Sequence, residues 1–158
     1  MAEVYFYHLT RRSVVDTLTP LLTRSLAQGW RVAVRGGDSD RLHWLDEKLW
    51  LGDPAAFLPH GLAGGEHDAR QPILLTAGAA GNAPNCLMSI DGADVTAQEV
   101  LALTRACILF DGNDGEALTR ARQQWRDLTD AGLPARYWSE ESGKWEQKVT
   151  KNIDADGG

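Results

Sequence analysis

The sequence predicts a three-layer α/β/α sandwich with a mostly parallel sheet. Short runs of β-branched and aromatic residues alternate with longer segments whose apolar residues recur at three- and four-residue steps. Strands that alternate with helices are typical of a parallel sheet covered on both faces. The 158 residues, 43% of them hydrophobic and 24% charged, are enough for one globular domain with its own core.

The first strand and the first helix lie close together in the sequence. Residues 4–8 are β-branched or aromatic and predict a buried strand. Ser13 or Asp16 can cap a helix that continues to about Gln28. Pro20 lies inside this segment and indicates either a kink or a later helix start.

A second strand and a second helix lead into a long loop. Residues 31–35 predict the strand, and Asp38 or Ser39 caps a helix that ends near Trp50. Residues 51–71 are rich in glycine and proline and predict an irregular loop. Loops longer than about 12–15 residues are often functional.

The second half of the chain continues the alternation of strands and helices. Thr96 caps a short helix, and a long helix extends from about Asp114 to Ala131. Gly132 follows it, at a position where glycine commonly ends a helix. We expect short buried strands at residues 72–75, 86–90, 106–110 and 135–138.

The chain is expected to form a single domain over residues 1–138, followed by a polar, partly disordered tail over residues 139–158. Its two cysteines, Cys86 and Cys107, are too few for a disulfide scaffold or a Cys-based zinc cluster. We see no signal-peptide pattern, and no apolar run approaches the roughly 20 residues that span a bilayer. We therefore expect a cytoplasmic protein without membrane contact.

No catalytic or cofactor motif is recognisable. The loop after the first predicted strand lacks glycine, and the loop at residues 36–38 lacks the lysine and hydroxyl of a phosphate-binding loop. None of the four histidines forms an i, i+4 pair for zinc, and Ser89 and Ser139 lack a Gly-x-Ser-x-Gly pattern. We expect a protein that is not an enzyme and uses no cofactor and no metal.

The charge balance is acidic, with 16 Lys and Arg against 22 Asp and Glu, a formal net charge of −6. Sequence-independent DNA binding requires a dense basic face, because it depends on the release of counterions from phosphates. Any nucleic-acid role therefore requires a local patch or acts through another protein.

The long helix carries one candidate binding site. At 100° per residue from Leu118, Trp125 falls on the apolar stripe, and Arg122 and Arg126 follow at about 40° and 80°. Two guanidinium groups beside an aromatic wall suit a short acidic peptide with an apolar end group. In the alternative interpretation, Trp125 is simply core and both arginines are ordinary solvated residues.

A second candidate site follows the second helix. Trp50 at the helix end and Phe57, Leu58, Pro59 and His60 in the long loop can form an exposed apolar patch. Aromatic anchors of this kind are typical of protein interfaces. In the alternative interpretation, the loop folds back so that Trp50 and Phe57 fill a core of their own.

Several segments resemble the chi subunit of the bacterial DNA polymerase III holoenzyme. The most specific is Leu-Asp-Glu-x-Leu-Trp followed by Phe-Leu-Pro-His-x-Leu-Ala, between residues 45 and 63. Val4-Tyr5-Phe6-Tyr7-His8-Leu9 precedes it, and Ala121-Arg122-x-x-Trp125-Arg126 follows it ahead of Ala131-Gly132. These segments occur in the expected order and cover about residues 3–138.

The resemblance implies a non-catalytic replication accessory subunit whose fold is similar to nucleotide-binding folds but has no phosphate loops. It implies two partners, the acidic C-terminal tail of single-stranded DNA-binding protein, which ends in Pro-Phe, and the psi subunit of the clamp loader where the host has one. The resemblance also implies that the chain binds no nucleotide, and direct nucleic-acid binding is not expected. The implied tail site is Arg122, Trp125 and Arg126, and the implied psi interface is Trp50, Phe57, Leu58, Pro59 and His60.

The chain departs from the family pattern at two positions of the tail site. Leu118 stands where some relatives carry a further basic residue, and Trp125 stands where tyrosine is common. Two rival interpretations remain open. A small α/β enzyme of the nucleotide or phosphate hydrolase type would bind phosphate at the loop after the first strand. A generic protein-interaction module would not retain single-stranded DNA-binding protein in a pulldown.

Overall fold

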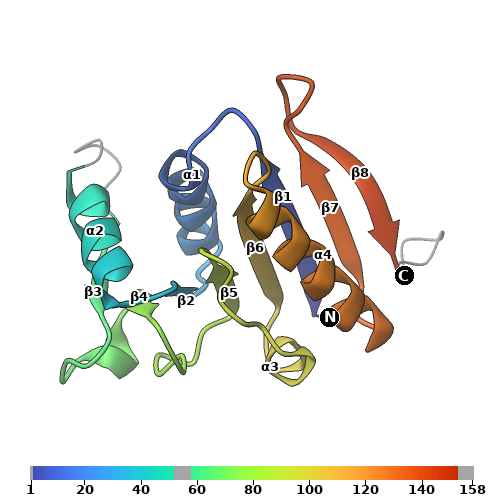
Figure 1. The fold of residues 1–158 in the computed structure, drawn as a ribbon. Coiled ribbons are helices and arrows are strands. Elements are labelled where there is room, and N and C mark those ends of the chain that lie inside the picture. Colours follow the sequence, from blue (N-terminus) through green and yellow to red (C-terminus); the bar gives the residue numbers. More distant parts are fainter. Residues whose placement is uncertain (1, 52–57, 153–158) are drawn as a thin grey trace.

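The structure is a computed structural model that describes residues 2–51 and 58–152. Its strands are β1 (Glu3–Leu9), β2 (Val32–Arg35), β3 (His60–Leu62), β4 (Ile73–Thr76), β5 (Cys86–Ser89), β6 (Arg105–Asp111), β7 (Ala135–Ser139) and β8 (Glu146–Lys151). They form one sheet in the order β3-β4-β2-β5-β6-β1-β7-β8 (Figure 1). Neighbouring strands are parallel except for the antiparallel pair β7 and β8.

The helices begin at side-chain caps that the sequence predicts. Ser13 accepts a hydrogen bond from the Asp16 backbone N–H, and Asp38 accepts one from the Arg41 N–H. Thr96 and Asp114 cap the other two helices in the same way. The helices are α1 (Val14–Ala27), α2 (Ser39–Trp50), α3 (Ala97–Leu101) and α4 (Gly115–Asp130), and a short 3₁₀ helix covers Asp68–Arg70.

Successive residues of the strands face two separate apolar layers. On β2, Val34 packs in the layer that contains Leu18 of α1 and Leu45 of α2. Its neighbour Ala33 packs in the opposite layer, which contains Leu128 of α4. Because side chains alternate along a strand, α1 and α2 cover one face of the sheet, and α3 and α4 cover the other. The predicted three-layer α/β sandwich is confirmed.

The first helix begins at Val14, directly after the predicted cap Ser13, and passes through Pro20, so the later start that the sequence also allowed does not occur. Two other local expectations require correction. The long loop is not wholly irregular, because His60–Leu62 pairs in parallel with β4 and Asp68–Arg70 forms a 3₁₀ turn. The C-terminal tail contains the strand Glu146–Lys151, paired with β7.

The sequence does not predict strand β8, because this strand lies at the edge of the sheet. Five of its six residues are exposed, so no alternation of apolar and polar residues marks it. Its conformation is stabilised by pairing with β7 and by Asn152, whose amide donates to the carbonyls of Thr129 and Leu133 at 2.9 Å each. Exposed lysines on such a strand oppose pairing with another chain.

Candidate protein-interaction site

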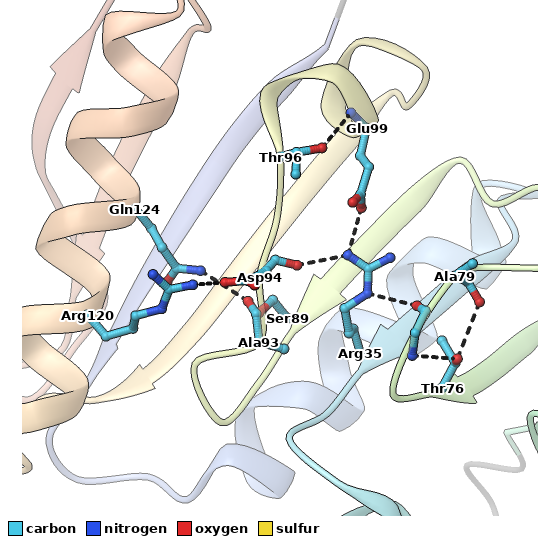
Figure 2. A network of polar contacts seen from close by, with 11 residues as sticks. Arg35, Thr76, Ala79, Ser89, Ala93, Asp94, Thr96, Glu99, Arg120 and Gln124 are labelled. Atoms are coloured by element: carbon cyan, nitrogen blue, oxygen red, sulfur yellow. Dashed lines mark hydrogen bonds and ion pairs between the residues drawn. The ribbon is translucent and has the colours of Figure 1, made fainter.

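Helix α4 is fixed against the sheet by apolar and polar contacts. Ala121 and Leu128 are buried on its inner face, as the helical spacing predicts. Gln124 is also buried there, and its amide donates to the Ala93 carbonyl at 3.0 Å. Arg120 forms an ion pair with Asp94 (Figure 2). These contacts fix the rotation of the helix and therefore the direction of its outer side chains.

The sequence left open whether Trp125 is a core residue or part of a binding surface, and the structure shows features of both. Its ring packs edge-on against Phe6 with ring centroids 5.2 Å apart, and against Tyr137 at 5.9 Å. The side chain is nevertheless only half-buried. Trp125 therefore belongs to the core and also presents part of its ring to solvent.

Arg122 and Arg126 are both exposed. Arg126 donates to the Gln123 side chain at 2.9 Å, one turn earlier on the helix. No hydrogen bond or ion pair connects Arg122 to another residue in the part of the chain that the structure describes. The structure thus brings together Arg122, Trp125 and Arg126 as one surface with a guanidinium group available to a ligand.

Tyr137 adjoins this surface and is supported by the buried His8, and the sequence predicts neither residue at the site. The Tyr137 hydroxyl and His8 Nδ1 form a hydrogen bond of 2.8 Å. Burial raises the pKa of Tyr137 to about 12, and the positive charge of Arg122 nearby acts in the opposite direction. The only signal in the sequence is the strand pattern at residues 135–138, which does not show that Tyr137 lies opposite Phe6 of β1.

The second predicted patch is only partly exposed. Trp50 is 52% exposed, and its ring lies against the His60 ring with centroids 4.2 Å apart. Leu51, which follows it, is 80% exposed. Phe57 lies outside the described residues, and Pro59 is half-buried.

Leu58 and His60 lie inside the protein rather than on the predicted patch. The His60 side chain is fully buried, with Nδ1 2.6 Å from the Leu58 carbonyl and Nε2 3.1 Å from Asp46 Oδ1. Leu58 packs in the core with α1 and α2. The expectation that these two residues present an apolar surface is wrong, because both side chains are buried and only the His60 ring contacts Trp50.

A comparison with protein families shows to which family the chain belongs. A family model described as DNA polymerase III chi subunit, HolC, matches residues 1–136. The chain belongs to the chi subunit family. None of the curated proteins compared with it matches. Chi is an accessory subunit of DNA polymerase III, so the family takes part in DNA replication.

The hydrolase interpretation requires a phosphate at the loop after β1. In this chi chain, a carboxylate occupies that loop. Glu140, only 1% exposed, accepts hydrogen bonds from the backbone N–H groups of Thr10 at 3.3 Å and Arg12 at 3.2 Å. These are donors that a phosphate would need after a strand. The loop after β1 is therefore already saturated by a side chain of the same protein.

A buried arginine fills the corresponding region after β2. Arg35 donates to the Gly78 carbonyl at 2.9 Å, to the Asp94 carbonyl at 2.8 Å and to Glu99 at 2.6 Å (Figure 2). Ligands of open α/β sheets bind outside the carboxyl ends of the strands. In chi, this network connects the loops there to each other instead.

Among residues 2–51 and 58–152, no group of three His, Cys, Asp or Glu side chains is arranged to hold a metal ion. Within the same ranges, no helix is both long enough and apolar enough to cross a membrane.

Proposed function

We propose that this chi chain is a non-catalytic, cytoplasmic subunit that links the clamp loader of DNA polymerase III to the C-terminal tail of single-stranded DNA-binding protein. The observation that supports this most directly is Arg122, exposed and without an ion-pair partner among the described residues, beside the half-buried rings of Trp125 and Tyr137. A tail that is acidic and ends in Pro-Phe offers carboxylates for the guanidinium group and a ring for the aromatic wall.

The electrostatics favour modest, salt-sensitive binding. The chain carries a net charge of −6, so the long-range field opposes an acidic tail and only the local arginines attract it. Leu118 stands one turn before Arg122, where a basic residue would add to the attraction. Exposed charges are screened at physiological salt, so affinity falls as salt rises.

The second proposed partner is the psi subunit, bound at Trp50. The ring of Trp50 and the side chain of Leu51 are exposed next to each other at the end of α2. Large aromatic residues supply much of the binding energy at protein interfaces. The His60 ring lies against the Trp50 ring. Pro59 and Phe57 belong to the proposed interface through the resemblance alone.

A pulldown with the immobilised chain tests both assignments. Full-length single-stranded DNA-binding protein is expected to be retained, and the same protein without its C-terminal tail is not. Arg122→Ala is expected to lose this partner and keep psi, whereas Trp50→Ala is expected to lose psi and keep this partner. Equal retention of the tail-less protein contradicts the proposed tail site, and failure to retain the full-length protein favours a generic interaction module.

A further inference from the structure

A second cleft lies on the other face of the sheet, away from α4. It has a volume of about 540 Å³ and lies beside α1 and the turn that connects β7 to β8. Tyr5 and Tyr7 of β1 line it, because they point to the face opposite Phe6. Trp138 and Trp145 line it as well. Binding sites for small ligands have volumes of about 300–1,000 Å³.

The cleft combines these aromatic rings with positive charge. The Arg105 guanidinium lies 4.2 Å from the centre of the Tyr5 ring, and that of Arg12 lies 5.9 Å from the centre of the Trp145 ring. Arg24, exposed on α1, also lines the cleft. Asp16 is the one carboxylate in the lining. The local charge is therefore opposite in sign to that of the chain.

Two hydrogen-bond donors in the lining have no partner among the described residues. Trp138 Nε1 and Arg105 Nε are both buried, and neither donates to a protein acceptor. Buried donors are rarely left without a partner in folded proteins. Donors of this kind in a positively charged cleft indicate a ligand that carries acceptor oxygens or nitrogens.

We propose that this cleft binds a nucleotide, with the base against the rings of Tyr7, Trp138 and Trp145 and the phosphate near Arg12. Stacked aromatic rings with flanking arginines are the usual means of holding unpaired bases. The same chemistry is offered by a free mononucleotide and by a unit of single-stranded DNA. This site departs from the expectation that the chain binds neither nucleotide nor nucleic acid directly. It is the local patch that a chain with a net charge of −6 requires for such a contact.

The proposal differs from the tail site in position and in ligand. Arg122 and Trp125 lie on α4, whose apolar side packs in the opposite layer from Tyr5 and Tyr7. A nucleotide and a tail peptide therefore do not compete for the same residues. It also differs from the phosphate-loop interpretation, because it uses none of the backbone N–H groups that Glu140 occupies.

The test is fluorescence anisotropy of a labelled oligothymidine with the full chain at low salt. Binding is expected, with competition from unlabelled oligothymidine. If thymidine monophosphate competes at a similar concentration of nucleotide, a free nucleotide is a sufficient ligand. If it does not compete, the ligand is single-stranded DNA. No binding at low salt overturns the proposal, as does displacement by inorganic phosphate alone at the concentrations at which the nucleotide acts.

Variants distinguish binding in the cleft from a general effect of positive charge on oligothymidine binding. Trp145→Leu is expected to weaken binding about tenfold, since stacking of one base contributes about 1–3 kcal/mol. Arg12→Gln is expected to weaken binding and lower the salt slope by about one. Arg122→Gln removes the same charge from α4 and is expected to leave binding unchanged. Equal effects of the two arginine variants overturn the proposal.

A spectroscopic readout keeps the test independent of variant stability. The indole N–H signal of Trp138, assigned by its loss in Trp138→Phe, is expected to shift when oligothymidine is added to the wild-type chain. Its donor gains a partner on binding, which changes the shielding of the proton. A titration that moves the signals of α4 and leaves the Trp138 indole signal in place overturns the assignment of the site.

Discussion

Tyr137 packs against Trp125 at the candidate tail site, with ring centroids 5.9 Å apart. Its hydroxyl is hydrogen-bonded to His8 of the neighbouring strand. Helical spacing and the resemblance to the chi family predict Trp125 and the two arginines. The His8–Tyr137 contact joins residues 129 positions apart, so only the register between β1 and β7 reveals it.

The raised pKa of Tyr137 makes stability depend on alkaline pH. A phenol with a folded-state pKa of about 12, against an ordinary value of 10.0, favours the folded state while it keeps its proton. This contribution is complete below about pH 10 and is lost as pH rises towards about 12. We expect the free energy of unfolding by urea to fall over this range, and to fall less steeply in Tyr137→Phe.

Tyr5→Phe tests the same mechanism on the other face of the sheet: burial also raises the pKa of Tyr5, so this variant should likewise decline less steeply than the wild type. Tyr137→Phe should in addition cost about 0.5–1.5 kcal/mol at neutral pH, through loss of the hydrogen bond to His8. An alkaline decline of the same slope in the wild type and Tyr137→Phe, measured by urea titrations at several pH values, would contradict the assignment.

At the level of elements, α1 is the helix whose sequence is least suited to its structure. Pro20 occupies its seventh position, where it has no N–H to donate to the Asp16 carbonyl. The sequence allowed a kink or a later start, and Ser13 decides in favour of the early start by capping the Asp16 N–H at 3.0 Å. Tertiary packing of Leu18 and Leu22 outweighs the local preference.

Replacing this proline should stabilise the protein. Pro20 is exposed, so Pro20→Ala restores a backbone hydrogen bond without opening a cavity. We expect the free energy of unfolding to rise by about 1–3 kcal/mol, since proline is about 3 kcal/mol less favourable than alanine inside a helix. Thermal melts should show a much smaller rise for Thr23→Ala, an exposed control in the same helix. A decrease for Pro20→Ala would show that the proline contributes contacts of its own.

The end of α4 depends on the left-handed conformation of Gly132, whose φ is +89°. A Cβ at this position meets no atom within 4 Å, so the cost of Gly132→Ala is purely one of backbone strain. We expect a loss of about 1 kcal/mol in unfolding free energy. Gly115→Ala, at the other end of the helix and equally open, should be neutral or stabilising. Similar melting temperatures for both variants would contradict this account.

Prediction from the sequence succeeds for elements whose side chains are buried. The strands of the central sheet and the caps at Thr96 and Asp114 follow from local patterns. Strands β3 and β8 do not, because β3 has three residues and β8 has almost no buried side chains. Both lie at edges of the sheet, where pairing with a neighbour, rather than a local pattern, determines the conformation.

Over the whole molecule, the two faces of the sheet separate the proposed activities. The α4 face carries the tail site, the opposite face carries the aromatic cleft, and the end of α2 carries Trp50. The carboxyl ends of β1 and β2, where related folds bind nucleotides, are filled by Glu140 and Arg35. Chi thus uses a fold of the nucleotide-binding type as a scaffold for surfaces.

The central claim is that the Arg122 surface binds the acidic tail. A peptide from the C-terminus of single-stranded DNA-binding protein, labelled and followed by fluorescence anisotropy, measures this directly for the wild type and Arg122→Ala. Arg126→Ala should have a smaller effect, and Trp125→Ala is a poorer test, because removing a core ring costs about 3–5 kcal/mol of stability. Arg24→Ala, an exposed arginine on α1, is the control.

An arginine that faces a carboxylate in a partly desolvated site contributes about 1.5–3 kcal/mol. Arg122→Ala should therefore weaken binding on the order of tenfold to a hundredfold, with an unchanged thermal melt. Added salt should weaken the wild type more than this variant, because the variant has less attraction to screen. Wild-type affinity in a folded Arg122→Ala protein would contradict the account and remove this face of α4 from the tail site.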